Sequence, residues 1–225
     1  MEKSTFKLEN DLIENGYELV IGIDEAGRGP LAGPVVAGAV ILKNSELRAV
    51  KYEIRELDLI RDSKTLSEKQ REKLFDFIQE KFFVGVGICD HKTIDKINIL
   101  EASFLAMKKA VADLFRNERL RKCNSKQKMM VLLDGNKKIP NFSMEQRAIV
   151  SGDKIVKSIS AASIIAKVTR DRIMKEAHNT YSKFGFDKHK GYGTYFHMEM
   201  LKKYGPCEIH RKSFEPVKIL VKTGK

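Results

Sequence analysis

Four acidic residues lie at the ends of apolar segments, where they could carry out chemistry together: Asp24, Glu25, Asp134 and Asp153. An acid at the end of an apolar strand is poorly placed for a core but well placed for a site at the carboxyl edge of a sheet. Several carboxylates brought together cannot all stay ionised without cations, and Mg²⁺ or Mn²⁺ is the natural counterion for such oxygen ligands. Two ions about 3.5–4 Å apart can bind both the attacking and the leaving oxygen of a phosphodiester displacement.

Strand geometry restricts how the first two acids can act together. Neighbouring residues of a strand face opposite sides of the sheet. Asp24 and Glu25 can therefore share a site only if the strand ends or bulges at that point. Gly27 and Gly29 follow directly and allow such an ending.

A structural interpretation of the same acids stays open on spacing alone. Asp24 and Asp134 could be turn formers, because Asp-Gly at 134–135 is a common turn sequence. Asp153 could cap the N-terminus of the helix expected after it. Residue type and spacing do not decide between these roles and metal binding.

The elements that must position these acids alternate along the chain. Apolar, β-branched runs predict strands at residues 18–24, 33–42, 82–89, 129–134 and, as a short fifth, 147–150. Apolar residues at helical spacing predict helices at 67–81, 93 to about 119, 157 to about 177, and 195–204. Ser67 is a typical N-cap for the first of these helices.

Segments between and within these elements add to the pattern. The small residues at 160–163 would let their helix lie close to a sheet or to a ligand backbone. Residues 179–193 form a basic, aromatic and glycine-rich segment that we expect to be a loop. The polar, basic connection at 116–128 and the tail at 219–225 receive no assignment.

The order of the elements predicts the fold class. Early strands in succession, followed by strands that alternate with helices, favour an α/β fold with a mixed sheet and helices on both faces. No linker divides the chain. We therefore expect a single domain over residues 1–225, with a core at about 18–177 and a basic helical region at about 178–225.

Composition excludes several classes of protein. With 42% hydrophobic and 32% charged residues, the 225-residue chain is neither disordered nor collagen-like. The longest apolar runs are shorter than the roughly 20 residues that span a bilayer. Residues 1–16 carry several acids and lack a signal-peptide pattern. The three cysteines are widely spaced without a C-x-x-C motif, which argues against a disulfide framework and favours the reducing cytoplasm.

The net charge of +12 is unevenly distributed along the chain. Residues 154–225 contain 16 Lys and Arg against 6 Asp and Glu, so that +10 of the total lies in the last third. A basic region beside a nearly neutral one suggests a polyanionic partner, most simply nucleic acid. The alternative is that the charge serves solubility alone.

Several motifs, read in order, resemble those of ribonuclease HII, the bacterial type 2 ribonuclease H. They are GIDEAGRGPLAGPVVAG at 22–38, DSKTLS at 62–67, LDGN at 133–136, GDKIVKSISAASIIAKVTRDR at 152–172, HKGYGT at 189–194 and HRKSF at 210–214. The resemblance covers the chain from about residue 18 to 217.

This resemblance implies a ribonuclease H-like fold, with a mixed five-stranded sheet, flanking helices and a central carboxylate cluster. The four acids match the catalytic and metal-binding positions of the family, which uses Mn²⁺ or Mg²⁺, with two ions in the catalytic complex. The family hydrolyses RNA in RNA–DNA hybrids to give 5′-phosphate and 3′-hydroxyl ends. It also nicks 5′ of a single ribonucleotide embedded in duplex DNA, a step in ribonucleotide excision repair. We expect a cytoplasmic monomer that binds these nucleic acids and no membrane.

The resemblance also implies substrate-binding residues. Bare backbone at Gly27, Arg28 and Gly29 can approach a sugar closely and, with Tyr192, would recognise the ribose 2′-hydroxyl, which is both a donor and an acceptor. Tyr192 would stack on the deoxyribose that follows. Further substrate contacts are expected at Lys64, Asn136, Ser160, Ser163 and Lys167.

Other polar residues are left outside this predicted site. The five histidines have no spacing typical of a zinc site. For His189 and His210, which lie within motifs, we expect a structural role rather than a phosphate contact. Arg170 and Arg172 are equally well explained as a solvated helix face.

Rival interpretations remain to be compared. Ribonuclease HIII shares the fold but lacks the Gly-Arg-Gly triplet and carries an extra N-terminal domain, whereas about 17 residues precede the first expected strand here. Transposase and resolvase nucleases of this fold lack the opening motif. A non-catalytic, basic nucleic-acid-binding module is the third alternative, and the presence of all four acids argues against it.

Overall fold

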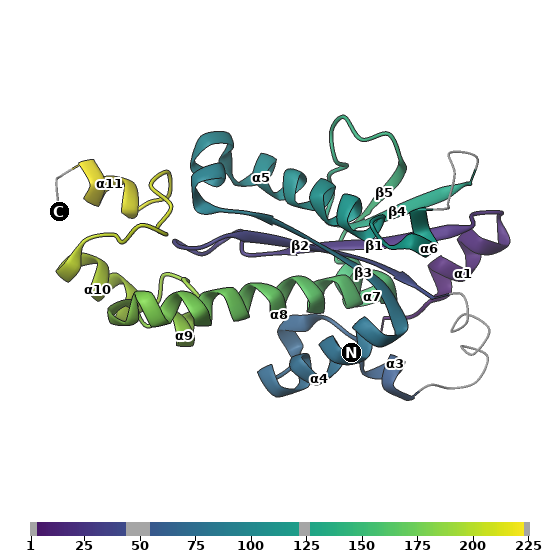
Figure 1. The fold of residues 1–225 in the computed structure, drawn as a ribbon, viewed down its shortest axis with the longest axis horizontal. Coiled ribbons are helices and arrows are strands. Elements are labelled where there is room, and N and C mark those ends of the chain that lie inside the picture. The colour runs from purple at the N-terminus through teal and green to yellow at the C-terminus, as the bar shows by residue number, and fades with distance from the viewer. Residues whose placement is uncertain (1–3, 44–54, 122–126, 223–225) are drawn as a thin grey trace.

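A five-stranded mixed sheet forms the centre of the structure, a computed structural model that describes residues 4–43, 55–121 and 127–222 (Figure 1). The strands are β1 (Leu19–Ala26), β2 (Val35–Leu42), β3 (Phe82–Cys89), β4 (Met129–Asp134) and β5 (Glu145–Ile149). Their order across the sheet is β3-β2-β1-β4-β5. The β1–β2 and β2–β3 pairs are antiparallel, whereas β4 is parallel to both β1 and β5. The predicted mixed sheet is therefore confirmed.

The described helices are α1 (Lys7–Glu14), α3 (Arg55–Leu59), α4 (Glu68–Lys81), α5 (His91–Leu114), α6 (Glu118–Arg121), α7 (Gly152–Ile155), α8 (Lys157–Thr180), α9 (Phe186–His189), α10 (Tyr195–Tyr204) and α11 (Val217–Lys222). Short 3₁₀ turns occur at η1 (Ser63–Thr65) and η2 (Ser182–Phe184). Ser67 caps α4 as predicted, because its side chain accepts from the amide of Gln70 and the Gln70 side chain accepts from the amide of Ser67.

The structure differs from the predicted elements in several places. Helices α1, α3, α7 and α11 were not predicted, and the bounds of β1, β2 and β5 differ by one or two residues. Helix α5 ends at Leu114, before the expected 119, and bends at Asn98, where φ is 65° and the side chain caps the following turn. The expected loop at 179–193 contains the end of α8, η2 and α9. Within 116–128, residues 118–121 form α6, and 122–126 lie outside the described residues, as do 223–225 of the C-terminal segment.

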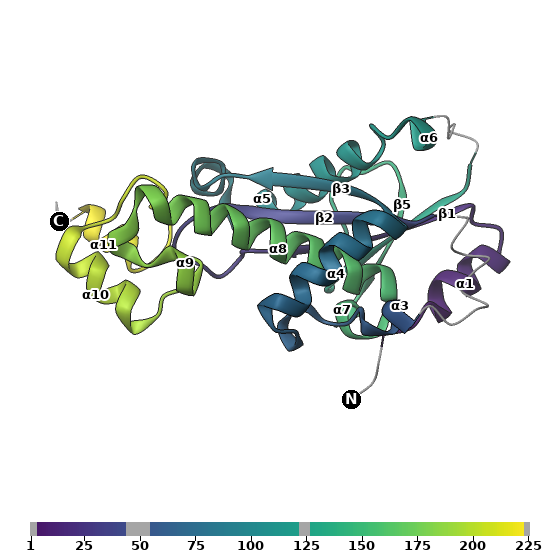
Figure 2. The same cartoon turned by 60° about the horizontal axis from the view of Figure 1, so that its bottom comes forward.

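Helices cover both faces of the sheet (Figures 1 and 2). Helix α5 packs on one face, and α4 and α8 pack on the other. A Cβ atom at Gly22 would lie 2.3 Å from the backbone of Ser158, and one at Gly38 would lie 2.6 Å from the carbonyl oxygen of Ala162. The small residues of α8 therefore do bring this helix close to the sheet, as expected, and glycines on β1 and β2 leave the room for it.

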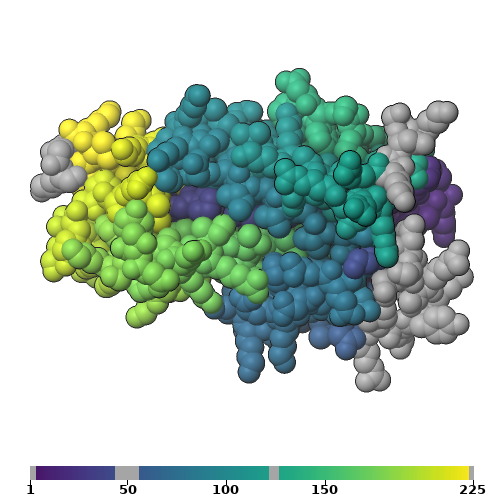
Figure 3. Space-filling view, in the orientation of Figure 1, coloured from purple at the N-terminus to yellow at the C-terminus, as the bar shows by residue number. Residues whose placement is uncertain are grey.

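The C-terminal helices gather at one end of α8, beyond the tips of β1 and β2 (Figure 2). A separate apolar cluster joins them to the loop that connects β1 and β2, through residues that include Leu31, Ala32, Met174, Phe186 and Leu201. In the space-filling view the sheet is almost covered, and only a short purple stretch of the early chain is visible between α5 and α8 (Figure 3). Of the described helices, none is long and apolar enough to cross a membrane.

Candidate active site

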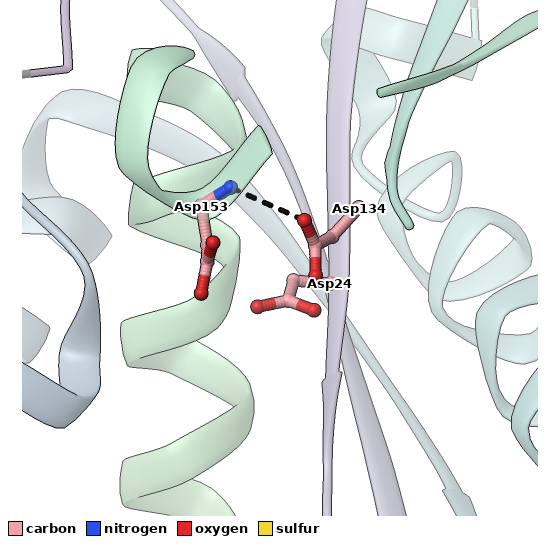
Figure 4. Close-up of side chains that lie close together, drawn as sticks. All are labelled: Asp24, Asp134 and Asp153. Atoms are coloured by element: carbon pink, nitrogen blue, oxygen red, sulfur yellow. Dashed lines mark hydrogen bonds between the residues drawn. The ribbon is translucent and has the colours of Figure 1, made fainter. Parts of the chain in front are cut away.

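The parallel pairing of β1 and β4 brings the first two aspartates together. Ile23 of β1 lies opposite Leu133 of β4, and the next residues along the two strands are Asp24 and Asp134. The side chains of these two residues approach each other in Figure 4. Asp24 follows Gly22 on the same side of β1, the side that α8 covers, since alternate strand residues share a face.

Asp153 arrives from a tight reversal of the chain after β5. Ser151 adopts a left-handed conformation, with φ of 55°, and Asp153 then lies in the first turn of α7. Its amide nitrogen donates to Oδ1 of Asp134 over 3.3 Å (Figure 4). The Ser160 hydroxyl, one turn into α8, donates to the carbonyl oxygen of Asp153 over 2.8 Å.

Asp24, Asp134 and Asp153 together form a carboxylate cluster that fits a metal ion. One oxygen from each lies within 4.8 Å of the others, and Asp24 and Asp153 are buried. Burial raises the pKa of Asp24 well above its usual value, and the charges of Glu25 and Asp134 raise it further. Burial also raises the pKa of Asp134, together with the charge of Asp153. Such carboxylates need a cation to stay ionised, and a divalent ion among three oxygen ligands meets that need.

The carboxylate of Glu25 lies beside this cluster and pairs with the guanidinium of Arg28. Oε1 of Glu25 accepts from the guanidinium of Arg28 over 3.1 Å. Burial raises the pKa of Glu25, and the charge of Arg28 opposes this shift. Contrary to the condition stated from the sequence, β1 neither ends nor bulges at Glu25, because its regular pairing with β2 continues to Ala26. Glu25 nevertheless lines the cavity, at the edge of β1 that β4 leaves unpaired beyond Asp134.

Asp24, Glu25 and Asp134 line a cavity of about 290 Å³, whereas Asp153 is not among its lining residues. Its lining comes from the β1 end and the loop after it, from η1, from β4, from α8 and from the segment after α9: Asp24, Glu25, Ala26, Gly27, Arg28, Gly29, Ser63, Lys64, Asp134, Ser163, Lys167, Arg170 and Tyr192. A larger cavity of about 640 Å³ at the other end of β1 contains one acid, Glu18, among its lining residues. The carboxylate cluster therefore assigns the chemistry to the smaller cavity.

Cations and hydroxyls from α8 and η1 surround the acids. The ammonium of Lys64 lies 3.1 Å from Oδ2 of Asp153 and remains largely exposed. The hydroxyls of Ser63 and Ser163 lie 2.8 Å apart. Lys167 pairs with Asp171 at 2.7 Å. These contacts leave polar groups along the rim where a charged substrate would enter.

Tyr192 and the 27–29 turn face each other across the cavity. A Cβ atom at Gly29 would lie 3.6 Å from the ring of Tyr192, which is ordinary contact distance. The ammonium of Lys167 lies 6.0 Å from the centre of that ring. Gly27 has a φ of 102°, a conformation that L-residues with side chains rarely adopt.

Two predicted substrate contacts do not reach the cavity. Ser160 is fully buried, and its hydroxyl lies within hydrogen-bond distance of the carbonyl oxygens of Asp153 and Val156. Asn136 is exposed but is absent from the cavity lining. Ser163, three residues further along α8, does line the cavity. A substrate contact at Ser160 or Asn136 stays a prediction.

Sequence reasoning missed two buried arginines that support the cavity wall. Arg170 was interpreted as equally a solvated residue, yet it is only 1% exposed, and Arg211 is fully buried. Both donate to backbone carbonyl oxygens of the β1–β2 loop. The position of both arginines within the motifs at 152–172 and 210–214 could have marked them as important. Their burial and their hydrogen-bond partners are not visible from the sequence.

The burial and contacts of His197 and His210 support the structural role expected for His210, and the same role for His189 stays a prediction. His197 and His210 are fully buried, and their Nε2 atoms lie 2.9 Å apart. Nε2 of His189 lies 2.6 Å from the carbonyl oxygen of Phe184. None of the three lines the cavity.

Comparisons with known proteins agree with this geometry. Residues 21–217 match the sequence pattern of the ribonuclease HII family. A ribonuclease HII from Fusobacterium nucleatum subsp. nucleatum is 53% identical over 201 residues, which span 88% of this chain and 86% of that protein. The crystal structure of ribonuclease H2 from Pyrococcus horikoshii OT3 aligns with a TM-score of 0.66 at 29% identity, covering 91% of this chain and 98% of that chain.

A third similarity concerns the fold alone. The crystal structure of Bst-RNase HIII in complex with Mn²⁺ aligns with a TM-score of 0.70 at 16% identity, over 93% of this chain and 71% of that chain. The solved structures confirm the expected ribonuclease H-like fold. The chain is 53% identical to the ribonuclease HII from Fusobacterium nucleatum subsp. nucleatum and only 16% identical to Bst-RNase HIII, which favours the first family over the second.

Proposed function

The chain belongs to the ribonuclease HII family, and on this premise we propose the substrates, metal ions and residue roles that follow. It is an endoribonuclease that acts on the RNA of RNA–DNA hybrids. We propose that it also nicks duplex DNA on the 5′ side of a single ribonucleotide, and that both reactions leave 5′-phosphate and 3′-hydroxyl ends.

The cluster of Asp24, Asp134 and Asp153 is the observation that carries this proposal. These residues, with Glu25 beside them, would hold two Mg²⁺ or Mn²⁺ ions. The chemistry that such ions supply is stabilisation of the attacking and leaving oxygens of a phosphodiester. The protein's part is to keep the carboxylates together, and the Asp153 amide does this by donating to Asp134.

The 27–29 turn and Tyr192 would identify the ribonucleotide. The turn has little side-chain bulk, so its backbone can approach the ribose closely. Tyr192 is 45% exposed and adjoins Gly29 across the cavity, which suits a ring that stacks on the next sugar. A 2′-hydroxyl between them distinguishes RNA from DNA because deoxyribose offers no oxygen at that position.

Lys64, Ser163 and Lys167 would contact phosphates. All three line the cavity, two of them carry positive charge, and Lys64 is largely exposed. Lys64 also pairs with Asp153. An ammonium between a carboxylate and the entrance can move to a phosphate without crossing a large distance.

The first test is a cleavage assay on duplex DNA that contains one ribonucleotide, with Mg²⁺, Mn²⁺ or EDTA, and with products mapped to the nucleotide. We expect a nick immediately 5′ of the ribonucleotide with either metal ion and no product with EDTA. A uniform RNA–DNA hybrid and an all-DNA duplex of the same sequence are the matched controls.

Other outcomes would select the rivals. Cleavage of the hybrid without cleavage at the single ribonucleotide would retain the carboxylate site and remove the proposed recognition by Tyr192 and the 27–29 turn. Binding without cleavage under every metal condition would favour a non-catalytic nucleic-acid-binding module and overturn the proposal.

A further inference from the structure

Two buried arginines without acidic partners support the cavity: Arg170 contributes to its lining and Arg211 lies behind it. Arg170 is 1% exposed and Arg211 is fully buried. Within the described residues, neither forms an ion pair with a carboxylate. Burying an unpaired cation is costly unless its donors are all satisfied. The hydrogen bonds that satisfy them therefore indicate what these residues do.

Arg211 donates to four carbonyl oxygens of the β1–β2 loop. Its Nε bonds to Gly33 over 3.0 Å, and Nη1 bonds to Arg28 over 3.0 Å. Its Nη2 bonds to Gly27 over 2.6 Å and to Pro34 over 3.2 Å. A planar guanidinium with a fixed fork of donors can meet several carbonyls at once, whereas an ammonium cannot.

Arg170 ties the same loop to the segment that carries Tyr192. It donates to the carbonyl oxygens of Pro34 over 2.9 Å, of Ala32 over 3.1 Å and of Lys190 over 3.0 Å. A Cβ atom at Gly27 would lie 2.2 Å from its Nε, so the side chain also packs directly under the turn. The two sides of the cavity are thus joined through one side chain.

This use of the carbonyls determines where the amides point. In a planar trans peptide, the C=O of one residue and the N–H of the next point in opposite directions. Because the carbonyls of Gly27 and Arg28 point to Arg211, the amides of Arg28 and Gly29 point away from it. Arg211 does not line the cavity, whereas the turn does. Among the described residues, the amides of 27–29 donate no hydrogen bond outside the strand ladder.

We infer that Arg170 and Arg211 are positioning residues for ribose recognition: they hold the carbonyls of the 27–34 loop inward, so that the amides of Arg28 and Gly29 are free to donate to the 2′-oxygen. The inference rests on the proposed function. It assigns recognition of the ribonucleotide to a backbone conformation that the C-terminal part of the chain and α8 maintain. Arg211 does not line the cavity, and the guanidinium of Arg170, which does, donates to three backbone carbonyl oxygens.

The test measures preference for ribose rather than activity alone. Binding of a fluorescent duplex with one ribonucleotide is compared with binding of the same all-DNA duplex, with Ca²⁺ in place of Mg²⁺ and a gel to verify that no cleavage occurs. The ratio of the two dissociation constants does not depend on the fraction of folded protein. We expect the wild-type protein to prefer the ribonucleotide duplex.

Arg211→Lys keeps the charge but cannot hold four carbonyls. We expect this preference to fall by about tenfold or to vanish, on the scale of one charge-assisted hydrogen bond, with the affinity for all-DNA duplex unchanged. Ile78→Val in the core between α4 and the sheet is the matched control: it lowers the melting temperature and leaves the preference as it is. Should Arg211→Lys not fold, Arg170→Lys provides the same measurement.

The outcomes separate the two hypotheses. An Arg211→Lys protein with lower stability but wild-type preference would overturn the inference and leave the proposed function intact. A wild-type protein that binds both duplexes equally would overturn the proposed recognition of ribose, and the inference with it.

Discussion

At the scale of single residues, the ionised form of Asp24 is strongly disfavoured by its surroundings. It is buried, and its pKa is raised by burial and by the charges of Glu25 and Asp134. A raised carboxyl pKa means that the folded state without metal loses stability as pH rises through that pKa. The ionised carboxylate of Asp24 is nevertheless the form that would bind a metal ion.

Asp24→Asn should therefore separate function from stability. We expect cleavage to fall by at least about a hundredfold, the scale on which losing one key electrostatic group lowers turnover, while duplex binding in EDTA is retained. The amide of Glu25 can still donate to Oδ1, as it does to Asp24 over 2.7 Å. Without metal, the melting temperature should rise by a few degrees at pH 8 and approach the wild-type value as pH falls.

Asp76→Asn, on the exposed side of α4, is the matched control for removal of one carboxylate. It should leave cleavage unchanged. Wild-type cleavage by the Asp24→Asn protein would show that the metal assignment is wrong.

In contrast to the buried Asp24, the ring of Tyr192 is half exposed. Tyr192→Ala should reduce cleavage at a single ribonucleotide by about tenfold or more, since stacking on a nucleotide contributes about 1–3 kcal/mol. Its melting temperature should change little. Tyr192→Phe, which retains the ring, should keep most of the activity that stacking provides. Equal cleavage by all three proteins would return Tyr192 to the role of an ordinary surface residue.

At the scale of elements, a chain of hydrogen bonds connects α10 to the segment that carries Tyr192. The amide of Cys207 donates to Nδ1 of His210 over 2.9 Å, and the two Nε2 atoms of His210 and His197 lie 2.9 Å apart. Nδ1 of His197 lies 2.9 Å from the carbonyl oxygen of Tyr192. One consistent assignment has both rings neutral, His210 donating to His197, and His197 donating to Tyr192.

This chain predicts a loss of stability in mild acid. Burial lowers the pKa of His197 to about 4 and that of His210 to about 3. Between these values and 6.5, the unfolded chain binds more protons than the folded one, so the free energy of unfolding falls as pH falls. Between pH 6.5 and pH 5, each histidine should lower the free energy of unfolding by on the order of 2 kcal/mol.

Urea unfolding at several pH values between 7 and 5 would measure this loss. Replacing both His197 and His210 with Gln should flatten the profile, because glutamine does not titrate. The raised carboxyl pKa values of Asp24 and Glu25 act with the opposite sign. A wild-type free energy of unfolding that stays constant or increases towards pH 5 would contradict the prediction.

At the scale of the whole molecule, the C-terminal third both carries the charge and completes the site. Residues 154–225 account for +10 of the net +12. From this region come Lys167 and Tyr192 in the cavity lining and Arg211 behind it. Because a cluster of apolar side chains also joins it to the β1–β2 loop, we propose that the chain is one domain rather than a nuclease core with a separate binding module.

Binding should therefore weaken steeply as salt increases. A plot of log affinity against log salt has a slope of roughly −0.9 for each phosphate neutralised. We expect a slope corresponding to several phosphates for an all-DNA duplex. Lys64→Gln and Lys167→Gln should each reduce its magnitude by about one. A slope near zero would show that the basic region is not a binding surface.

The sequence by itself determined the five strands, the helices α4, α5, α8 and α10, and the family. The strand at 82–89 and the helix at 195–204 were predicted to the residue, because glycine, proline and the hydrophobic period are local signals. The resemblance identified the acids in order. The helix predicted to about 119 ends at Leu114. The bend at Asn98, whose carboxamide oxygen accepts from the amides of Leu100 and Glu101, was not predicted.

Only the tertiary structure decided which polar groups meet. Asp153 lies against Asp134 because β5 and α7 reverse the chain, and Ser160 turns inward while Ser163 faces the cavity. Arg211 reaches the carbonyl of Gly27 across a sequence separation of 184 residues. Burial and hydrogen-bond partners at such separations depend on packing of the whole chain, and for that reason the support behind the predicted site was not visible from local sequence.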